Sequence, residues 1–297
     1  MSQERRAILA ASGAAVTLAI AKATVGILTG SMAVLSSAAD SLLDFFVSLV
    51  NLFAIKKAES PANEKYHYGF GKVEGLGALF EGLIVAASGI GIGVVSVNRL
   101  IAGKGPDELG PSLYVMLFSI AVTGILVAFL ARVAKSTGSL VVASDALHYK
   151  TDLLSNGAVL VGVLFMQFTG MLSVDAWISL AVSFYIVHSA IGIIRDAVAM
   201  LMDRSLPEDE VSVVRSIIEA EISQGNAESY HFFKTRKSGK IRHVEFHLVL
   251  RPDILLYDAH EIADSIEIEI RRRLDHAEVL VHLDPFDDSS INESRSK

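Results

Sequence analysis

The chain has 297 residues, of which 52% are apolar, and its mean hydropathy is +0.47. This composition is too apolar for an average soluble protein and predicts a membrane protein. The formal net charge of -7 argues against nucleic acid as a partner, because phosphate binding needs a basic surface. There is no cysteine, so any metal site must be built from His, Asp, Glu or backbone oxygen ligands.

Six apolar segments are each long enough to cross the hydrocarbon core of a bilayer, which takes about 20 helical residues. They cover residues 7–29, 32–56, 75–99, 111–132, 140–169 and 174–201, and Gly-, Ser- and Pro-rich turns separate most of them. The first segment follows MSQERR and leads into further spans, so we expect it to remain uncleaved. The sequence therefore predicts an α-helical membrane protein with a six-helix transmembrane domain over residues 1–205.

Lys and Arg concentrate at the N-terminus and in the second and fourth connections between spans. These residues are Arg5, Arg6, Lys56, Lys57, Lys65, Lys72, Arg132 and Lys135. Arg99 and Lys104 fall on the other side, but they are fewer. By the positive-inside rule we expect a multi-pass protein with both termini in the cytoplasm.

The composition changes near residue 206. LPEDEVSVVRSIIEAEIS has helical spacing, with a proline and acidic residues in its first turn. ESYHFFKTRKSG and KIRHVEFHLVLR alternate with a period of two and predict a hairpin. DAHEIADSIEIEIRRRL is helical again, and AEVLVHLDP alternates. This order predicts a small cytoplasmic α+β domain over residues 206–286, with its helices on one face of the sheet, and a disordered tail over residues 287–297.

Charged residues interrupt two of the predicted spans. Asp40 and Asp44 lie one helical turn apart in the second span, and His148 and Asp152 repeat that spacing in the fifth. A charge at mid-bilayer costs about 2.5 to 3.5 kcal/mol, so these groups need compensation. Side chains at i and i+4 share a helix face, so two helices can offer four ligands to one cation. Three carboxylates and one imidazole suit Zn²⁺ and other first-row divalent ions. Alternatively the charges lie at helix ends and reach water, as we expect for Lys22.

These four residues, the loop YHYGFGKVE and the sequence VHLDP resemble the cation diffusion facilitator family, in particular its bacterial zinc and ferrous-iron efflux branch. The resemblance covers residues 7–285, and DxxxD in the second span with HxxxD in the fifth is the family's transport site. It implies a homodimer in the bacterial inner (cell) membrane that exchanges Zn²⁺, Fe²⁺ or Cd²⁺ for protons by alternating access. It also implies that the C-terminal domain is ferredoxin-like and binds regulatory metal.

Histidines lie on one face of the predicted sheet. If the apolar residues of the strands face the helices, then His247, His282 and Asp284 project from the opposite face and predict a metal cluster. By the resemblance, His231 and His260 join them in a two-metal site at the dimer contact. A solvated face that carries histidines is the alternative, and we expect His243 to belong to such a face.

The resemblance bears on further positions in and beside the membrane domain. The loop PANEKYHYGFGK has Asn63, Tyr66 and Phe70 where the family branch has metal ligands, so we expect a third site to be absent or weak. Lys72 and Asp203 match a family ion pair that is thought to hold the two membrane halves of the dimer together.

Glu81 departs from the family branch, which tends to have a neutral amide at this position. It lies seven residues after Glu74, hence on nearly the same face of the third span. It could relay protons, pair with Lys22 or pack at the dimer contact.

Two other functions stay open at this point. One is a proton-coupled transporter or channel for another cation, which uses the same carboxylates as a proton relay. The other is a membrane metal sensor in which only the C-terminal domain binds metal. No GxxxxGK[ST] loop supports ATP-driven pumping, and HEIAD at 260–264 lacks the second histidine of an HExxH zinc protease. We therefore predict that the protein is not an enzyme.

Overall fold

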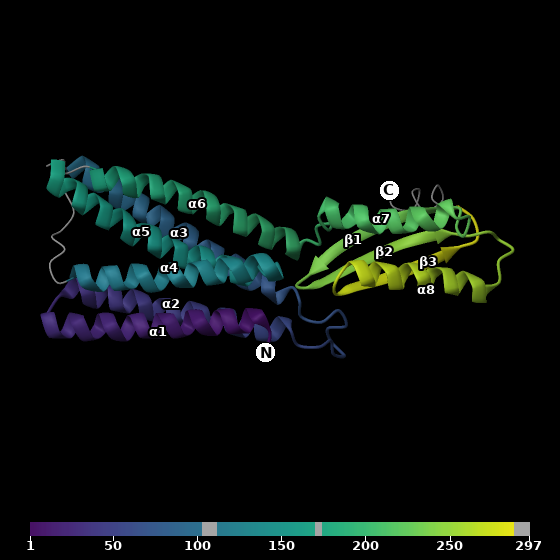
Figure 1. The fold of residues 1–297 in the computed structure, drawn as a ribbon, viewed down its shortest axis with the longest axis horizontal. Coiled ribbons are helices and arrows are strands. Elements are labelled where there is room, and N and C mark those ends of the chain that lie inside the picture. Colours follow the sequence, from purple (N-terminus) through teal and green to yellow (C-terminus); the bar gives the residue numbers. More distant parts are fainter. Residues whose placement is uncertain (103–111, 170–173, 288–297) are drawn as a thin grey trace. The chain divides into compact units, whose positions relative to one another are not determined.

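The computed structural model describes residues 1–102, 112–169 and 174–287 (Figure 1). The chain divides into two compact units, of which the first covers Met1–Val198 and the second begins at Ala199. Within the described residues, six long helices precede a helix, two strands, a helix and a third strand. This order confirms the predicted fold class. The predicted disordered tail, apart from Asp287, lies outside the described residues.

The first unit is helical. Its elements are α1 (Gln3–Thr29), α2 (Met32–Ala58), α3 (Val73–Ala102), α4 (Ser112–Thr137), α5 (Leu140–Thr169) and α6 (Val174–Leu201), the last of which continues into the second unit. Among the described residues, five helices are long and apolar enough to cross a membrane, namely α1, α2, α3, α4 and α6. The remaining long helix, α5, carries Asp145, Lys150 and Asp152.

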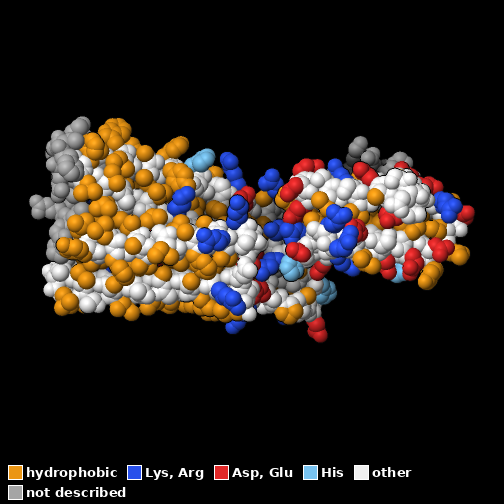
Figure 2. Space-filling model, viewed as in Figure 1, with side chains coloured by type: hydrophobic (Ala, Val, Ile, Leu, Met, Phe, Trp, Pro, Cys, Tyr) orange, Lys and Arg blue, Asp and Glu red, His pale blue; other side chains and the backbone are white. Residues whose placement is uncertain are grey.

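The outward surface of these helices is apolar. Large side chains such as Phe46, Phe53, Phe80 and Trp177 are exposed. Figure 2 shows apolar side chains over the visible face of the helices, with Lys and Arg gathered toward one end. A helix satisfies its own backbone hydrogen bonds, so such a surface is suited to the hydrocarbon core of a bilayer.

Close packing of α1 on α2 depends on two glycines. Gly30 ends α1 with a φ of 66°, which favours glycine, and Ser31 then caps α2 by accepting a hydrogen bond from the Val34 backbone N–H at 3.4 Å. A Cβ atom on Gly26 would lie 2.8 Å from the Leu35 side chain. The missing side chain therefore lets the two helices approach.

The α5 helix is fixed on several sides. Its N-terminus is capped by α3, because Glu74 Oε1 accepts a hydrogen bond from the Leu140 backbone N–H at 3.0 Å. The buried Tyr149 hydroxyl donates to the Ala11 carbonyl of α1 at 3.2 Å. Tyr149 also belongs to an apolar cluster with Leu130 of α4 and Ala54 of α2. These contacts hold the residues on either side of Tyr149 in place.

The second unit is a three-stranded sheet with two helices. Its elements are α7 (Glu208–Ser223), β1 (Ser229–Ser238), β2 (Ile241–Val249), α8 (Leu256–Arg273) and β3 (Ala277–Asp284). The strand order is β1-β2-β3, in which β1 pairs antiparallel with β2 and β2 pairs parallel with β3. Acidic residues in the first turn of α7 and arginines in the last turn of α8 match the helix dipoles.

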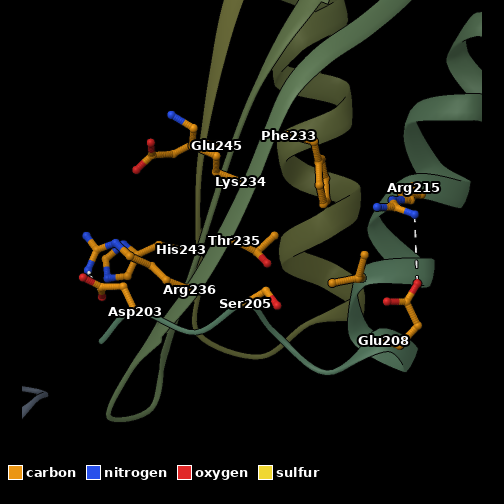
Figure 3. Close-up of a pocket in the computed structure, with 11 residues that line it drawn as sticks. Asp203, Ser205, Glu208, Arg215, Phe233, Lys234, Thr235, Arg236, His243 and Glu245 are labelled. Carbon is orange, nitrogen blue, oxygen red and sulfur yellow. Dashed lines mark hydrogen bonds and ion pairs between the residues drawn. The ribbon is translucent and has the colours of Figure 1, made fainter. Parts of the chain in front are cut away.

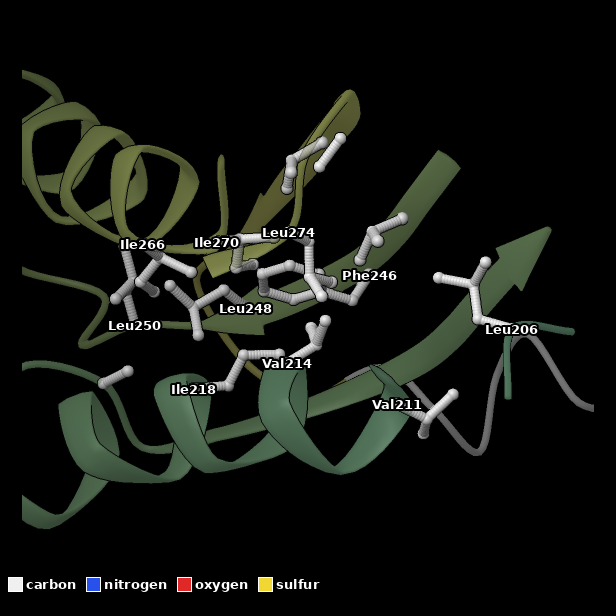
Figure 4. Close-up of a cluster of buried hydrophobic side chains, with 14 of the residues drawn as sticks. Leu206, Val211, Val214, Ile218, Phe246, Leu248, Leu250, Ile266, Ile270 and Leu274 are labelled. Atoms are coloured by element: carbon white, nitrogen blue, oxygen red, sulfur yellow. The ribbon is translucent and has the colours of Figure 1, made fainter. Parts of the chain in front are cut away.

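Both helices cover the same face of the sheet, as predicted. Figure 4 shows the buried core between them. It contains Val214 and Ile218 from α7, Phe246, Leu248 and Leu250 from β2 and the end that follows it, and Ile266 and Ile270 from α8. The opposite face of the sheet carries Glu245 and His247 of β2 and Leu280 and His282 of β3.

Candidate metal centres

The first candidate centre lies between α2 and α5. Asp44, His148 and Asp152 each offer one ligand atom, and these atoms all lie within 4.8 Å of one another. Asp44 Oδ1 is 3.0 Å from His148 Nε2. His148 is buried, with 8% of its surface exposed, so the group is largely withdrawn from the surroundings. The i, i+4 spacing on α5 gives His148 and Asp152 one shared face, which points toward Asp44.

Asp40, the fourth predicted ligand, does not join this group. It is exposed on α2, one turn before Asp44, and it is absent from the set of ligand atoms within 4.8 Å. Its charge nevertheless acts on Asp152 and on Lys22. The structure thus brings three of the four predicted ligands together, and Asp40 lies exposed outside this group.

Lys22 differs from the expectation that it reaches water. The side chain is buried, with 8% of the residue exposed. Its Nζ donates to Ser41 Oγ at 2.8 Å and to the Ser37 carbonyl at 3.4 Å, both on α2. The close approach of α1 to α2 covers the lysine before its stem can extend outward. The buried side chain of Lys22 is therefore held on α2, the helix that carries Asp40 and Asp44.

Glu81 does not pair with Lys22. It is fully buried, and its Oε2 accepts hydrogen bonds from Asn51 Nδ2 at 3.0 Å and from the Ser144 hydroxyl. Glu81 therefore belongs to a polar group between α2, α3 and α5.

The second candidate centre lies on the open face of the sheet. His231, His247 and Asp284 each offer a ligand atom within 4.8 Å of the others. Asp284 Oδ2 is 2.8 Å from His247 Nδ1 and 3.2 Å from His231 Nε2. His282 Nε2 is 3.3 Å from the other Asp284 oxygen. Two imidazoles and a carboxylate, with a third imidazole beside them, are a donor set that suits Zn²⁺.

A β-bulge places His231 in this centre. Lys234 pairs with Glu245, whereas His231 pairs with His247, so β1 has one extra residue between these two pairs. Phe232 takes it up with a φ of 50°, which is rare for a bulky residue. Strict alternation counted from the hairpin turn would put His231 on the face that the helices cover. The sequence predicted the hairpin but not the bulge.

His260 lies apart from the other four predicted ligands. It is on α8, which packs on the other face of the sheet, and 68% of its side chain is exposed. Its Nε2 is 3.6 Å from Asp264 Oδ2, one turn further along the helix. Within one chain His260 therefore does not reach the cluster.

Two further residues near this sheet differ from expectation. His243 is buried, not solvated, and its Nδ1 is 3.2 Å from Glu278 Oε2. Burial lowers the pKa of His243, and the charge of Arg236 lowers it further. Asp287 Oδ1 is 3.6 Å from His231 Nδ1. Sequence reasoning missed Asp287 because it assigned this residue to the tail, although an acidic residue three positions after Asp284 is a usable signal.

A pocket of about 480 Å³ at the other end of β1 holds charges of both signs (Figure 3). Asp203 Oδ1 is 3.4 Å from Arg236 Nη1, and Glu208 Oε1 is 4.0 Å from Arg215 Nη1. Among the described residues, neither group of side chains that could hold a metal ion includes a residue of this pocket. The pairing of Asp203 with Lys72 stays a prediction.

The loop before α3 makes contacts without metal ligands at the family positions. Asn63 and Tyr66 form a short antiparallel bridge, and the Tyr66 and Phe70 rings lie 4.7 Å apart between centroids. Lys57 Nζ lies 3.5 Å from the centre of the Phe70 ring. The aromatic residues thus pack with their neighbours in the loop.

Comparisons with known proteins cover nearly the whole chain. The model of the cation efflux transmembrane domain matches residues 8–202, and that of the cation efflux protein cytoplasmic domain matches residues 206–286. The cation-efflux pump FieF of Escherichia fergusonii is 33% identical over 280 residues, which are 94% of this chain and 92% of that protein. FieF of Citrobacter koseri is 34% identical with the same coverage. FieF of Klebsiella pneumoniae is also 34% identical, with the same coverage. The chain is therefore a multi-pass membrane protein that belongs to the cation diffusion facilitator family of cation-efflux transporters.

Proposed function

We propose that the protein exports a divalent metal ion, with Zn²⁺ as the best fit and Fe²⁺ or Cd²⁺ as further substrates, in exchange for protons. The observation that carries this proposal is the convergence of Asp44, His148 and Asp152 from two apolar-flanked helices. Intramembrane ionisable groups that face the bundle interior commonly mark an ion pathway. The family shown above is one of cation-efflux transporters.

The ligand chemistry favours a borderline metal ion. One imidazole nitrogen and two carboxylates are three of the four donors that tetrahedral Zn²⁺ takes. Asp40 lies one turn from Asp44 on the same helix, and a change of its rotamer or of the α2 position would supply the fourth. Hard ions such as Mg²⁺ gain less from the nitrogen donor.

Exchange with protons follows from the same ligands. A metal ion binds only to a deprotonated imidazole and to ionised carboxylates, so metal and protons compete for His148, Asp44 and Asp152. Loading one displaces the other. For transport, the site must also face each side of the membrane in turn, which rocking of the helices against one another would provide.

The working form in this proposal is a homodimer. The match to the cytoplasmic domain of cation efflux proteins covers residues 206–286, which contain the second centre. His260 faces away from this centre in its own chain, so a second copy would have to supply it. Metal bound by His231, His247, His282 and Asp284 then acts as a regulatory ion that stabilises the dimer. Lys72 and Asp203 would add an ion pair between the membrane halves.

We assign the protein to the bacterial inner (cell) membrane with both termini in the cytoplasm. The basic residues at the N-terminus and in the connections after α2 and α4 support this orientation. The outward direction of transport follows from the inward proton gradient across such a membrane.

Metal uptake into vesicles tests the proposal. Purified protein is reconstituted with a zinc-sensitive dye inside, and uptake is recorded with and without a pH gradient. We expect Zn²⁺ flux that depends on the gradient and is lost in Asp44→Ala and His148→Ala. Flux of another cation without Zn²⁺ would support the alternative transporter or channel. Zn²⁺ binding without any flux would support a metal sensor.

A further inference from the structure

A second acidic group lies next to the first centre and takes no part in it. Glu81 of α3 and Asp145 of α5 are both fully buried, with 0% of each residue exposed. Asn51 of α2 joins them, because its Nδ2 is 3.0 Å from Glu81 Oε2 and 3.3 Å from Asp145 Oδ1. Ser144 donates to the same oxygen of Glu81, and Ser48 donates to Asp145 Oδ1 at 3.5 Å.

All of these donors bind the same oxygen of each carboxyl group, which is Oε2 of Glu81 and Oδ1 of Asp145. The other oxygens, Glu81 Oε1 and Asp145 Oδ2, are buried without a hydrogen-bond partner. Within the described part of the chain, no Lys or Arg forms an ion pair with either group. The buried Lys22 is engaged with Ser41 of α2. Two neighbouring acids therefore share a few neutral donors and lack a cation.

Two carboxylates that are buried together cannot both be charged without a large energetic cost. A single proton between them removes one charge and turns an unpartnered oxygen into a donor. The pair then titrates as one unit. Among the described residues, the other titratable groups that interact electrostatically with the pair are His148 and Tyr149, both on α5. The Tyr149 hydroxyl is engaged by Ser48 and Ala11, which leaves His148 as the neighbour whose charge changes.

We propose that Glu81 and Asp145 form a proton-binding site, separate from the metal ligands, whose proton leaves when the first centre loads a metal ion. This inference rests on the proposed function and deepens it. Asp145 lies three residues before His148 on the same helix, so the two share a face. A divalent cation bound by His148 adds positive charge beside the pair and makes the field at Asp145 more positive. The acidic pair then gives up its proton, and the exchange involves more protons than the metal ligands alone release.

The proposal is tested by counting protons. Full-length protein in detergent is titrated with Zn²⁺ in weak buffer, and a pH indicator reports the release. His247→Ala and Asp284→Ala in every sample remove the second centre. The protein with only these two substitutions is the parent. We expect the parent with Glu81→Gln or Asp145→Asn added to release fewer protons than the parent alone, by up to about one per bound Zn²⁺. Glu74→Gln changes another buried acid of α3, which caps α5, and should release as many protons as the parent.

Equal proton release from the parent and from both acidic-pair variants would overturn the proposal. Because either variant could fail to fold, infrared spectra of the metal-free protein provide a second measurement. The parent should show a protonated carboxyl band at neutral pH that Glu81→Gln and Asp145→Asn each lack, and an unchanged band in a folded variant would also overturn it. Zn²⁺ binding that Asp44→Ala does not weaken would instead contradict the proposed function, while the infrared result still decides the acidic pair.

Discussion

Replacing Asp44 by Asn removes one negative charge and keeps the shape of the side chain. Asp44 Oδ1 lies 3.0 Å from His148 Nε2, so a metal ion held by His148 is also within reach of Asp44. A carboxylate and a divalent ion about 4 Å apart attract by about 8 kcal/mol at an effective dielectric constant of about 20. Desolvation offsets much of this attraction. If about a third remains, the affinity for Zn²⁺ falls by about 100-fold, which corresponds to about 2.7 kcal/mol.

Calorimetric titration with Zn²⁺ measures this loss. The second centre is removed by His247→Ala and Asp284→Ala, so that only the first binds. The matched control is Asp196→Asn, which removes an exposed aspartate of α6 that lies outside both centres. We expect wild-type affinity in the control. An affinity in Asp44→Asn that equals the control would refute the reasoning, because Asp44 would then not be a metal ligand.

Three further predictions concern the C-terminal unit. Zn²⁺ at about 100 times its Kd should raise the free energy of unfolding of the unit by about 2.7 kcal/mol and therefore raise its Tm. Scanning calorimetry measures the Tm, and Asp284→Ala should abolish the rise that Zn²⁺ causes. Ile266→Ala should lower the free energy of unfolding by about 2 to 5 kcal/mol, because Ile266 is fully buried in the core; a chemical denaturation curve unchanged from wild type would contradict the packing. Burial lowers the pKa of His243, so the folded state favours the neutral ring. This contribution to stability is present above pH of about 6.5 and is lost as the pH falls through the folded pKa. In His243→Gln, the free energy of unfolding should therefore fall less than in the wild type as the pH is lowered. The same pH dependence in both proteins would contradict this role of His243.

The sequence predicted the fold class well because it depends on local patterns. Long apolar runs predicted the six long helices, and alternation predicted the strands of the C-terminal unit. The i, i+4 spacing likewise predicted which residues of α2 and α5 would share a face. Asp44, His148 and Asp152 meet because each spacing is local to one helix and the two helices are neighbours.

Features that depend on how helices rotate against one another were not predictable. Lys22 is buried because α1 packs closely on α2, and no pattern within α1 shows this. Glu81 meets Asn51 and Asp145 from two other helices, which a single sequence does not place. The same limit explains Asp40, whose spacing from Asp44 fixes its helix face but not its distance from α5.

Because of the bulge at Phe232, the face on which a side chain lies at one end of β1 does not follow by alternation from the other end. Residues near the hairpin turn alternate between the two faces of the sheet in one phase, and those near His231 alternate in the opposite phase. The position of His231 is set by its partner on the adjacent strand and not by its count from the turn. Removal of Phe232 would straighten the strand and still leave His231 opposite His247. Loss of a single codon here would therefore be tolerated by the second centre, whereas the same loss within β2 would move His247 to the other side of the sheet.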